Sequence, residues 1–220
     1  IGTPLGTVIH TGDFKIDHTP VDGIPTDFSN LSRLASNGVL LLLSDSTYAE
    51  HEGYTPSETV VSEALHKVIG EANGRVIVAT FASLISRVQQ VIDAAVYHGR
   101  RVAIMGRSMV DNVKIAQTLN YLNVPDGVVR PWEELKDSSP QDIVIITTGT
   151  QGEPTSGLVR IANHNHKEIE LLKGDTVIIS ASPIPGNETL ITRTIDNLFR
   201  QGAHVLHAGN ARVHVHGHAA

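Results

Sequence analysis

The sequence predicts an α/β protein in which a mostly parallel sheet is flanked by helices. Short, strongly apolar runs, such as residues 39–43 and 142–147, have the length and composition of strands buried on both faces. Segments with helical spacing of apolar residues separate these runs; in residues 84–98, for example, the apolar side chains share one face. Strands joined by helices of this length form right-handed crossovers, and such crossovers make neighbouring strands parallel.

The first part of the chain contains three expected elements. Residues 5–16 indicate a strand with a break at Gly12 and Asp13. Residues 27–38 indicate a short helix, capped by Asp27 or Ser29 and ended by a glycine. Residues 39–43 are a continuous apolar run, which predicts a strand that is covered on both faces and followed by four polar residues.

Helices and strands then alternate along the rest of the chain. We expect helices at residues 57–72, 84–98, 109–122, 157–164 and 188–201, and strands at residues 75–79, 101–105, 142–147, 175–180 and 204–207. Residues 125–140 are rich in Pro, Asp and Ser, and indicate a connection with one turn of helix at residues 132–135. No repeat of fixed period and no low-complexity tract is present.

Composition limits the class of protein. A chain of 220 residues holds one large domain, or one domain and part of another, and 40% hydrophobic with 18% charged residues is ordinary for a globular protein. No apolar run is long enough for a membrane span, and the first residues do not resemble a signal peptide. The absence of an initiator Met suggests that the chain begins partway through a longer protein.

Charge and cysteine content limit the chemistry. The net charge of -6 argues against a uniformly basic nucleic-acid-binding surface, although a local basic patch remains compatible with it. The chain has no cysteine, so any metal site must use His, Asp or Glu. The lack of cysteine also fits a cytosolic location.

Ligands of parallel α/β sheets bind at the carboxyl ends of the strands, which selects a set of loops. These loops are rich in Gly, Ser, Thr or Asp, a composition that indicates function: residues 11–13, 44–47, 81–83, 106–108, 147–153 and 180–187. Asp13 either binds a metal or supports a turn, and Asp45 either orients a histidine or ligand or caps a turn. Lys15, Arg87, Arg107, Arg193 and Arg212 are basic residues near these ends that could contact a polyanion backbone.

Two of these loops suggest anion binding. Residues 148–154, Thr-Gly-Thr-Gln-Gly-Glu-Pro, could present backbone N–H groups to an anion. Residues 180–188 contain two prolines and lead into a helix, which favours either a phosphate site or an ordinary helix cap at Asn187.

Histidines gather at the end of the chain. Five of the twelve histidines lie between residues 204 and 218, and His214, His216 and His218 alternate, so an extended segment would place them on one face. The pattern fits a metal site, a histidine-lined catalytic pocket or a solvated histidine tract.

Taken in order, several motifs resemble bacterial ribonuclease J, which belongs to the β-CASP branch of the metallo-β-lactamase-fold nucleases. The motifs are His10-Thr-Gly-Asp13-Phe-Lys, Asp17-x-Thr-Pro-Val21-Asp, Ser44-Asp-Ser-Thr47, Ala79-Thr-Phe-Ala-Ser83, the loop at residues 148–154 and the loop at residues 180–187. The resemblance covers essentially the whole chain. It implies an edge of a metallo-β-lactamase αββα domain at residues 1–56, followed by a β-CASP domain at residues 57–220.

The resemblance also implies an activity. Enzymes of this family use two divalent metal ions, most often zinc, with manganese or magnesium as alternatives, to hydrolyse RNA phosphodiester bonds. They remove nucleotides in the 5′-to-3′ direction from a 5′-monophosphate end and also cut internally. We therefore expect a cytoplasmic ribonuclease of rRNA processing and mRNA decay that binds RNA and no membrane, and that forms a homo-oligomer in its full-length form.

Site residues follow from the same resemblance. Asp13 matches the aspartate that bridges the two metals, and Asp45 matches the acidic residue of the first β-CASP motif. His218 matches the histidine of the second motif, so the resemblance implies that Asp45 and His218 are catalytic and that His214 and His218 act on the substrate side and in proton transfer. The two segments expected to contact RNA consist of Phe81, Ala82 and Ser83, and of His214, Val215, His216, Gly217 and His218.

The chain also departs from the family pattern. The His-x-His-x-Asp-His cluster, a further metal histidine and the Pro-x-His-Gly segment are absent, which leaves Asp13 as the one expected metal ligand. A single carboxylate does not hold two ions, so we expect the chain alone to be an inactive fragment. His216 stands where the family has Ser. The alternative is a non-catalytic RNA- or nucleotide-binding module; a DNA-directed or small-ester hydrolase is less favoured.

Overall fold

The computed structural model describes residues 1–220, which divide into two compact units. The first unit comprises Ile1–Thr59 and Val215–Ala220, and the second comprises Val60–His214. The sequence had suggested a boundary at residue 56 and assigned the last six residues to the second domain. In the structure those six residues pack with the first unit, whereas the division into domains by family remains a prediction.

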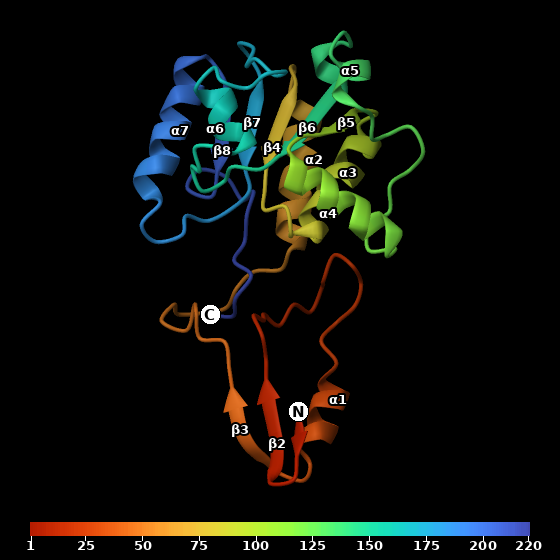
Figure 1. The fold of residues 1–220 in the computed structure, drawn as a ribbon, viewed down its shortest axis with the longest axis vertical. Coiled ribbons are helices and arrows are strands. Elements are labelled where there is room, and N and C mark those ends of the chain that lie inside the picture. Colours follow the sequence, from red (N-terminus) through yellow and green to blue (C-terminus); the bar gives the residue numbers. More distant parts are fainter. The chain divides into compact units, whose positions relative to one another are not determined.

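The second unit is built on a five-stranded, all-parallel sheet, which confirms the predicted fold class (Figure 1). The strand order is β5-β6-β4-β7-β8. The strands are β4 (Val76–Ala79), β5 (Arg101–Ile104), β6 (Ile143–Thr147), β7 (Thr176–Ile179) and β8 (His204–His207). All five begin and end within three residues of their predicted bounds, because short apolar runs between helices have few other ways to be buried.

Helices flank this sheet in Figure 1, as expected for parallel crossovers. They are α2 (Thr59–Glu71), α3 (Ile85–Tyr97), α4 (Arg107–Thr118), α5 (Trp132–Leu135), the 3-10 helix η1 (Pro140–Asp142), α6 (Gly157–Ala162) and α7 (Glu188–Arg200). Helix α4 begins two residues earlier than the sequence predicted. Gly106, at φ 96°, allows the sharp turn from strand to helix that moves the start forward.

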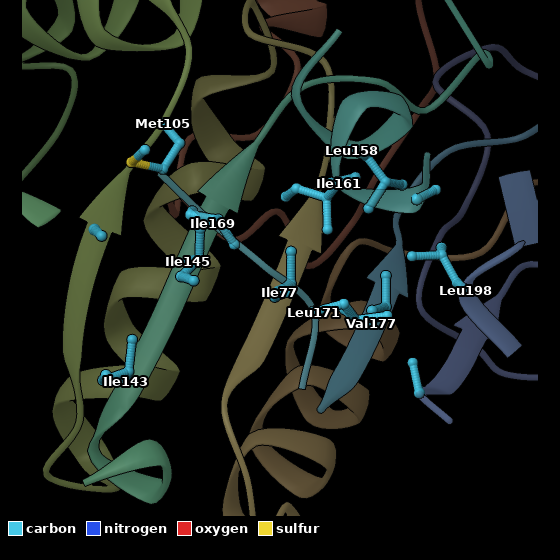
Figure 2. Close-up of a cluster of buried hydrophobic side chains, with 14 of the residues drawn as sticks. Ile77, Met105, Ile143, Ile145, Leu158, Ile161, Ile169, Leu171, Val177 and Leu198 are labelled. Carbon is cyan, nitrogen blue, oxygen red and sulfur yellow. The ribbon is translucent and has the colours of Figure 1, made fainter. Parts of the chain in front are cut away.

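The core of the second unit lies on the sheet faces. Alternate strand residues, such as Ile143 and Ile145, point to the same face, where they belong to one cluster with Leu158 and Ile161 of α6 and Leu198 of α7 (Figure 2). The strand residues between them are also buried, because helices cover the opposite face as well. This rigid two-sided core fixes the carboxyl ends of β4, β5 and β6 relative to one another.

The first unit has a smaller, three-stranded sheet of order β1-β2-β3. Its elements are β1 (Gly2–Thr3), β2 (Gly6–His10), α1 (Phe28–Ala35) and β3 (Val39–Leu43). Strand β1 is antiparallel to β2, and β2 is parallel to β3. Asp27 caps α1 as predicted, because its carboxylate accepts the backbone N–H of Asn30 at 2.8 Å.

Two predictions for the first unit were wrong. Strand β3 forms at the predicted residues, but its five side chains are exposed by 39–58%, so it is not covered on both faces. The break predicted at Gly12 and Asp13 is present, since Gly12 has φ 62°, but the strand ends at His10 and does not resume in residues 14–16. No helix of either unit is both long and apolar enough to cross a lipid bilayer.

Candidate active site

The parallel pairing of β2 and β3 brings two polar loops together. His10 pairs with Leu43 at the carboxyl ends of the two strands, and the N–H of Thr11 donates to the carbonyl of Leu43 at 3.0 Å. The next residues therefore leave the sheet side by side. The hydroxyl of Thr11 accepts the N–H of Asp45 at 3.0 Å, which joins the loop that carries Asp13 to the loop that carries Asp45.

Asp45 is held as an anion by three donors. Its Oδ1 accepts the N–H of Thr47 at 3.0 Å, and its Oδ2 accepts the N–H of Phe14 at 3.3 Å and faces Nδ1 of His218 at 2.7 Å. The hydrogen bonds from Thr47, His218 and Phe14, in that order, hold the pKa of Asp45 well below its usual range. The carboxylate thus stays charged and orients the imidazole of His218.

The segment around His218 is attached to the first unit through backbone groups. The hydroxyl of Thr55 donates to the carbonyl of His218 at 2.6 Å, and the N–H of Ala219 donates to the carbonyl of Phe14 at 2.8 Å. The ammonium group of Lys15 donates to the carbonyl of His216 at 3.2 Å. The His218 ring, whose side chain is 21% exposed, is therefore positioned from several sides and still reaches solvent.

Asp13, Asp45 and His218 form a cluster whose ligand atoms all lie within 4.8 Å of one another. Asp13 is exposed and makes no hydrogen bond or ion pair, so both of its oxygens are available to a cation. His218 keeps Nε2 for a ligand because Nδ1 faces Asp45. With His218 as a ligand, the three residues fit one divalent ion, since three protein ligands plus water suffice for catalytic zinc; with His218 as a proton donor, Asp13 and Asp45 remain to hold an ion. Two ions need more ligands than these three residues offer.

His216 lies in an aromatic stack. Its ring is parallel to that of Tyr48, with centroids 4.1 Å apart, and Tyr48 stacks on His51 at 3.6 Å. Burial lowers the pKa of His216, and the neighbouring His218 and His51 act in the same direction. His216 is therefore neutral at pH 7, and its buried Nδ1 has no hydrogen-bond partner. His216 thus packs against Tyr48 and is not one of the three residues of the Asp13, Asp45 and His218 cluster.

The alternating histidines do not lie on a strand. Residues 211–220 contain no strand, so a period of two does not place His214, His216 and His218 on one face. His214 belongs to the second unit and is half-buried, whereas Val215, which is buried, belongs to the first. Gly217 is exposed. Of the five predicted contact residues, only His218 joins the cluster with Asp13 and Asp45.

The second unit carries a cavity of about 620 Å³ at the carboxyl ends of β4, β5 and β6. The loops that follow these three strands line it, as sequence reasoning expected for functional loops. Phe81 and Ala82 are part of the lining; Ser83 is exposed and lies outside it.

The loop at residues 180–187 makes hydrogen bonds to Gln151, which lies in the neighbouring loop after β6. Gln151 is buried, donates to the carbonyl of Ser182 at 3.0 Å and accepts the N–H of Ile184 at 2.8 Å. Asn187 stands at the start of α7, but its side chain makes no capping hydrogen bond, so the ordinary cap predicted there is absent. Glu188 instead accepts the N–H of Gly186 at 2.9 Å.

Sequence reasoning did not place Arg160 and His166 among the functional loops, although both line the cavity; Thr155, Ser156 and Gly157, which also line it, were outside those loops too. The residues of a crossover helix and those after it normally lead away from the carboxyl edge of a parallel sheet, so Arg160, within α6, and His166, after it, were not expected near the carboxyl ends of the strands. Helix α6 has six residues, and a helix of this length rises only about 9 Å, too little to carry the chain across the sheet. An unusually short predicted helix was the available signal.

The parallel sheet with a polar cavity at its carboxyl edge, together with the Asp-Asp-His cluster, defines an α/β protein with a candidate ligand site and a candidate metal centre. Comparison with known proteins identifies the family. The family model described as "Ribonuclease J, beta-CASP domain" matches residues 73–198. The chain belongs to the ribonuclease J family.

Curated relatives agree with this assignment. The chain is 52% identical to ribonuclease J of Mycolicibacterium smegmatis over 219 residues. The aligned residues cover 100% of the chain and 39% of that protein. It is 48% identical to ribonuclease J of Thermus thermophilus over 219 residues, and here the aligned residues cover 100% of the chain and 38% of that protein. Ribonuclease J of Helicobacter pylori strain 26695 is 44% identical over 220 residues, 100% of the chain and 32% of that protein. The chain thus spans about two fifths or less of these relatives.

Proposed function

We propose that this chain is part of a metal-dependent ribonuclease that hydrolyses RNA phosphodiester bonds. The observation that carries the proposal is the pairing of Asp45 with His218 beside Asp13, in a chain of the ribonuclease J family. The paired residues are 173 positions apart in sequence, so the fold brings them together over a long distance. An anionic carboxylate with an oriented imidazole can supply acid–base catalysis for phosphodiester hydrolysis, and a free carboxylate can bind a metal ion.

Each residue of the cluster has a distinct role in this proposal. Asp45 holds Nδ1–H of His218, so Nε2 is the atom that exchanges a proton. During hydrolysis water attacks phosphorus and gives up one proton to solvent, the bond to the leaving oxygen breaks, and protonated His218 gives its Nε2 proton to that oxygen and regains one from solvent. Asp13, with its unpaired oxygens, would hold a divalent ion. When bound, the ion supplies Lewis-acid stabilisation of the negative charge on the phosphoryl oxygens.

We extend the proposal to the full-length enzyme by family resemblance. It would hold two divalent ions, most often zinc, with manganese or magnesium as alternatives, and would act in the 5′-to-3′ direction on RNA with a 5′-monophosphate and also internally. Phe81, Ala82 and Ser83, and the segment from His214 to His218, would contact the RNA. A cytoplasmic location, roles in rRNA processing and mRNA decay, and a homo-oligomeric state belong to the same proposal.

The test replaces His218 by Ala in the full-length enzyme. We expect cleavage of a 5′-monophosphorylated RNA oligonucleotide to fall by at least about 100-fold, the usual loss for a general acid. The matched control is His204→Ala, because His204 is an exposed histidine at the start of β8. Metal content, measured by mass spectrometry, should stay nearly unchanged if His218 transfers protons, and should fall if it is chiefly a metal ligand. Unchanged cleavage would refute the catalytic role.

A second candidate function is a non-catalytic RNA- or nucleotide-binding module. It is favoured by the polar cavity of the second unit and by a metal cluster that fits one ion where the family uses two. On this alternative, the purified 220-residue chain binds RNA in the presence of zinc or manganese and leaves it intact. Cleavage by that chain, lost in Asp13→Asn, would exclude the alternative.

A further inference from the structure

Four ring side chains of the first unit form a row beside the Asp-Asp-His cluster. In order they are His51, Tyr48, His216 and His218, and we call them the ring row. The ring of His51 is stacked on that of Tyr48, with planes 12° apart, and the ring of Tyr48 is stacked on that of His216, with planes 10° apart. The ring of His216 then meets that of His218, with centroids 5.2 Å apart and planes 48° apart.

Both faces of the Tyr48 ring are occupied. The turn after β3 places His51 on one face, since the N–H of His51 donates to the carbonyl of Tyr48 at 3.1 Å. His216 covers the other face, because two rings that are both nearly parallel to Tyr48, at 3.6 and 4.1 Å, would overlap if they shared a face. Tyr48 therefore joins the loop after β3 to the segment that carries His218.

Asp45 joins the same two parts of the chain a second time. Its Oδ1 accepts the N–H of Thr47, the residue before Tyr48, and its Oδ2 faces Nδ1 of His218. His216, on which Tyr48 stacks, lies two residues before His218. The loop after β3 thus holds the last segment at two points, by the carboxylate of Asp45 and by the ring of Tyr48.

The bond to Asp45 does not fix the imidazole of His218 completely. It holds Nδ1, but the ring can still turn about that atom, and such a turn moves Nε2, the nitrogen that exchanges the proton in the proposed function. The side chain of His218 is 21% exposed, so solvent leaves room for the turn. A second ring beside His218 restricts it, and in the row that ring is His216.

The ring of His216, and not its Nδ1, makes these contacts. This nitrogen is buried and has no hydrogen-bond partner, an arrangement that destabilises a protein, whereas stacked rings stabilise it. We propose that His216 is a positioning residue which, with Tyr48 and His51, holds the imidazole of His218 in one orientation beside Asp45. This inference rests on the proposed function, because that function makes His218 the proton donor.

Kinetics of the full-length enzyme test the role of the ring. His216→Ala removes the ring next to His218, so kcat for RNA cleavage should fall by about 10- to 100-fold while KM changes little. His216→Phe keeps a flat ring and removes both nitrogens, so it should keep kcat close to that of the parent. The control is His18→Ala, at an exposed histidine of the first unit outside the row, which should behave like the parent.

A double-mutant cycle tests whether the rings act as one unit. Tyr48→Ala should lower kcat about as much as His216→Ala, and Tyr48→Phe should keep it. Combining Tyr48→Ala with His216→Ala should lower kcat no further than either change alone, because each one already interrupts the row. Losses that multiply in the double variant would show that Tyr48 and His216 act independently, against the proposal.

Nuclear magnetic resonance of the ring nitrogens gives a readout that needs no cleavage. The purified 220-residue chain is measured with EDTA, well above the usual histidine pKa of about 6.5, and the His218 signals are those missing in His218→Gln. In the parent and in His216→Phe the two His218 nitrogens should have widely separated shifts, because the proton stays on Nδ1 beside Asp45. In His216→Ala the shifts should move together, because a turning ring exchanges its proton between both nitrogens.

Three results would overturn the proposal. Loss of kcat in His216→Phe as large as in His216→Ala would show that a nitrogen of His216 takes part in the chemistry. A rise in KM at constant kcat in His216→Ala would make His216 an RNA contact. His218 nitrogen shifts that stay unchanged in His216→Ala would show that the row does not hold the ring. If the full-length parent does not cleave RNA, the proposed function fails, and the nitrogen shifts still decide whether His216 positions His218.

Discussion

Lys15 connects three segments of the first unit through one ammonium group. It donates to the carbonyls of Pro56 and His216, both at 3.2 Å, and pairs with the carboxylate of Glu58 at 3.1 Å. Its side chain is 11% exposed, so these bonds are only weakly screened by solvent. Through His216 the lysine holds the backbone two residues before His218. It is a positioning residue for the histidine rather than a participant in the chemistry.

The substitution Lys15→Met tests this role. It keeps the length of the side chain and removes all three hydrogen bonds, which should destabilise the first unit by about 1–3 kcal/mol. In the full-length enzyme kcat for RNA cleavage should fall by about ten-fold or more while KM changes little, because a displaced His218 affects the transition state more than binding. Lys67→Met, at an exposed lysine on α2, is the control. A rise in KM at constant kcat would contradict the positioning role.

At the residue scale the sequence identified candidates but not their partners. Asp13, Asp45 and His218 were each selected by position after a strand or by motif, and Asp45 was a candidate for orienting a histidine, but no pattern indicated that this histidine lies 173 positions away. The one signal for Arg160 was the short predicted helix, because its place at the cavity depends on the short length of α6. His216 was unexplained by sequence; its stack on Tyr48 depends on how the last residues return to the first unit.

At the element scale, a buried ion pair joins the starts of β4 and β7. Arg75 and Asp175 precede the paired residues Val76 and Thr176, and the guanidinium binds the carboxylate through two bonds of 3.1 and 2.5 Å. The side chains are 7% and 1% exposed. The pair lies at the amino ends of the strands, away from the cavity loops, so it supports the sheet and not the site.

Asp175→Asn should therefore lower stability and leave ligand binding by folded protein unchanged. Removing one partner of a buried pair leaves the other charge uncompensated, at a cost of about 3–5 kcal/mol. Asp93→Asn, at an exposed aspartate of α3, should cost less than about 1 kcal/mol. Urea unfolding of both variants measures the difference. Equal free energies of unfolding for the two would show that the pair adds nothing to the sheet.

The elements of the second unit were predictable because local pattern and burial agree there. Strand β6, for example, is apolar along its length and buried along its length. In β3 they disagree: residues 39–43 have the composition of a doubly covered strand, but all five side chains are exposed. The apolar pattern of a strand indicates which side chains are suited to burial, but they are buried only where other elements of the structure pack against them.

At the scale of the whole molecule, the two units differ in what stabilises them. Val215 is the only buried residue of the first unit, which is held mainly by strand pairing and by the polar contacts of Asp45, Lys15 and Thr55. The second unit has apolar residues buried on both faces of a five-stranded sheet. Hydrophobic burial is the main stabilising contribution to folding, so the units should not share one stability.

Hydrogen exchange measures this difference. Amides of β2 and β3 should exchange at least about 100-fold faster than those of β4, β6 and β7, which corresponds to local opening that is easier by about 3 kcal/mol. The N–H of Thr11, bonded to Leu43 at the end of the small sheet, and the N–H of Thr80, bonded to Thr147 at the end of the large one, are a matched pair of reporters. Equal protection of the two would mean that the polar contacts around Asp45 and Lys15 stabilise the first unit as strongly as a hydrophobic core.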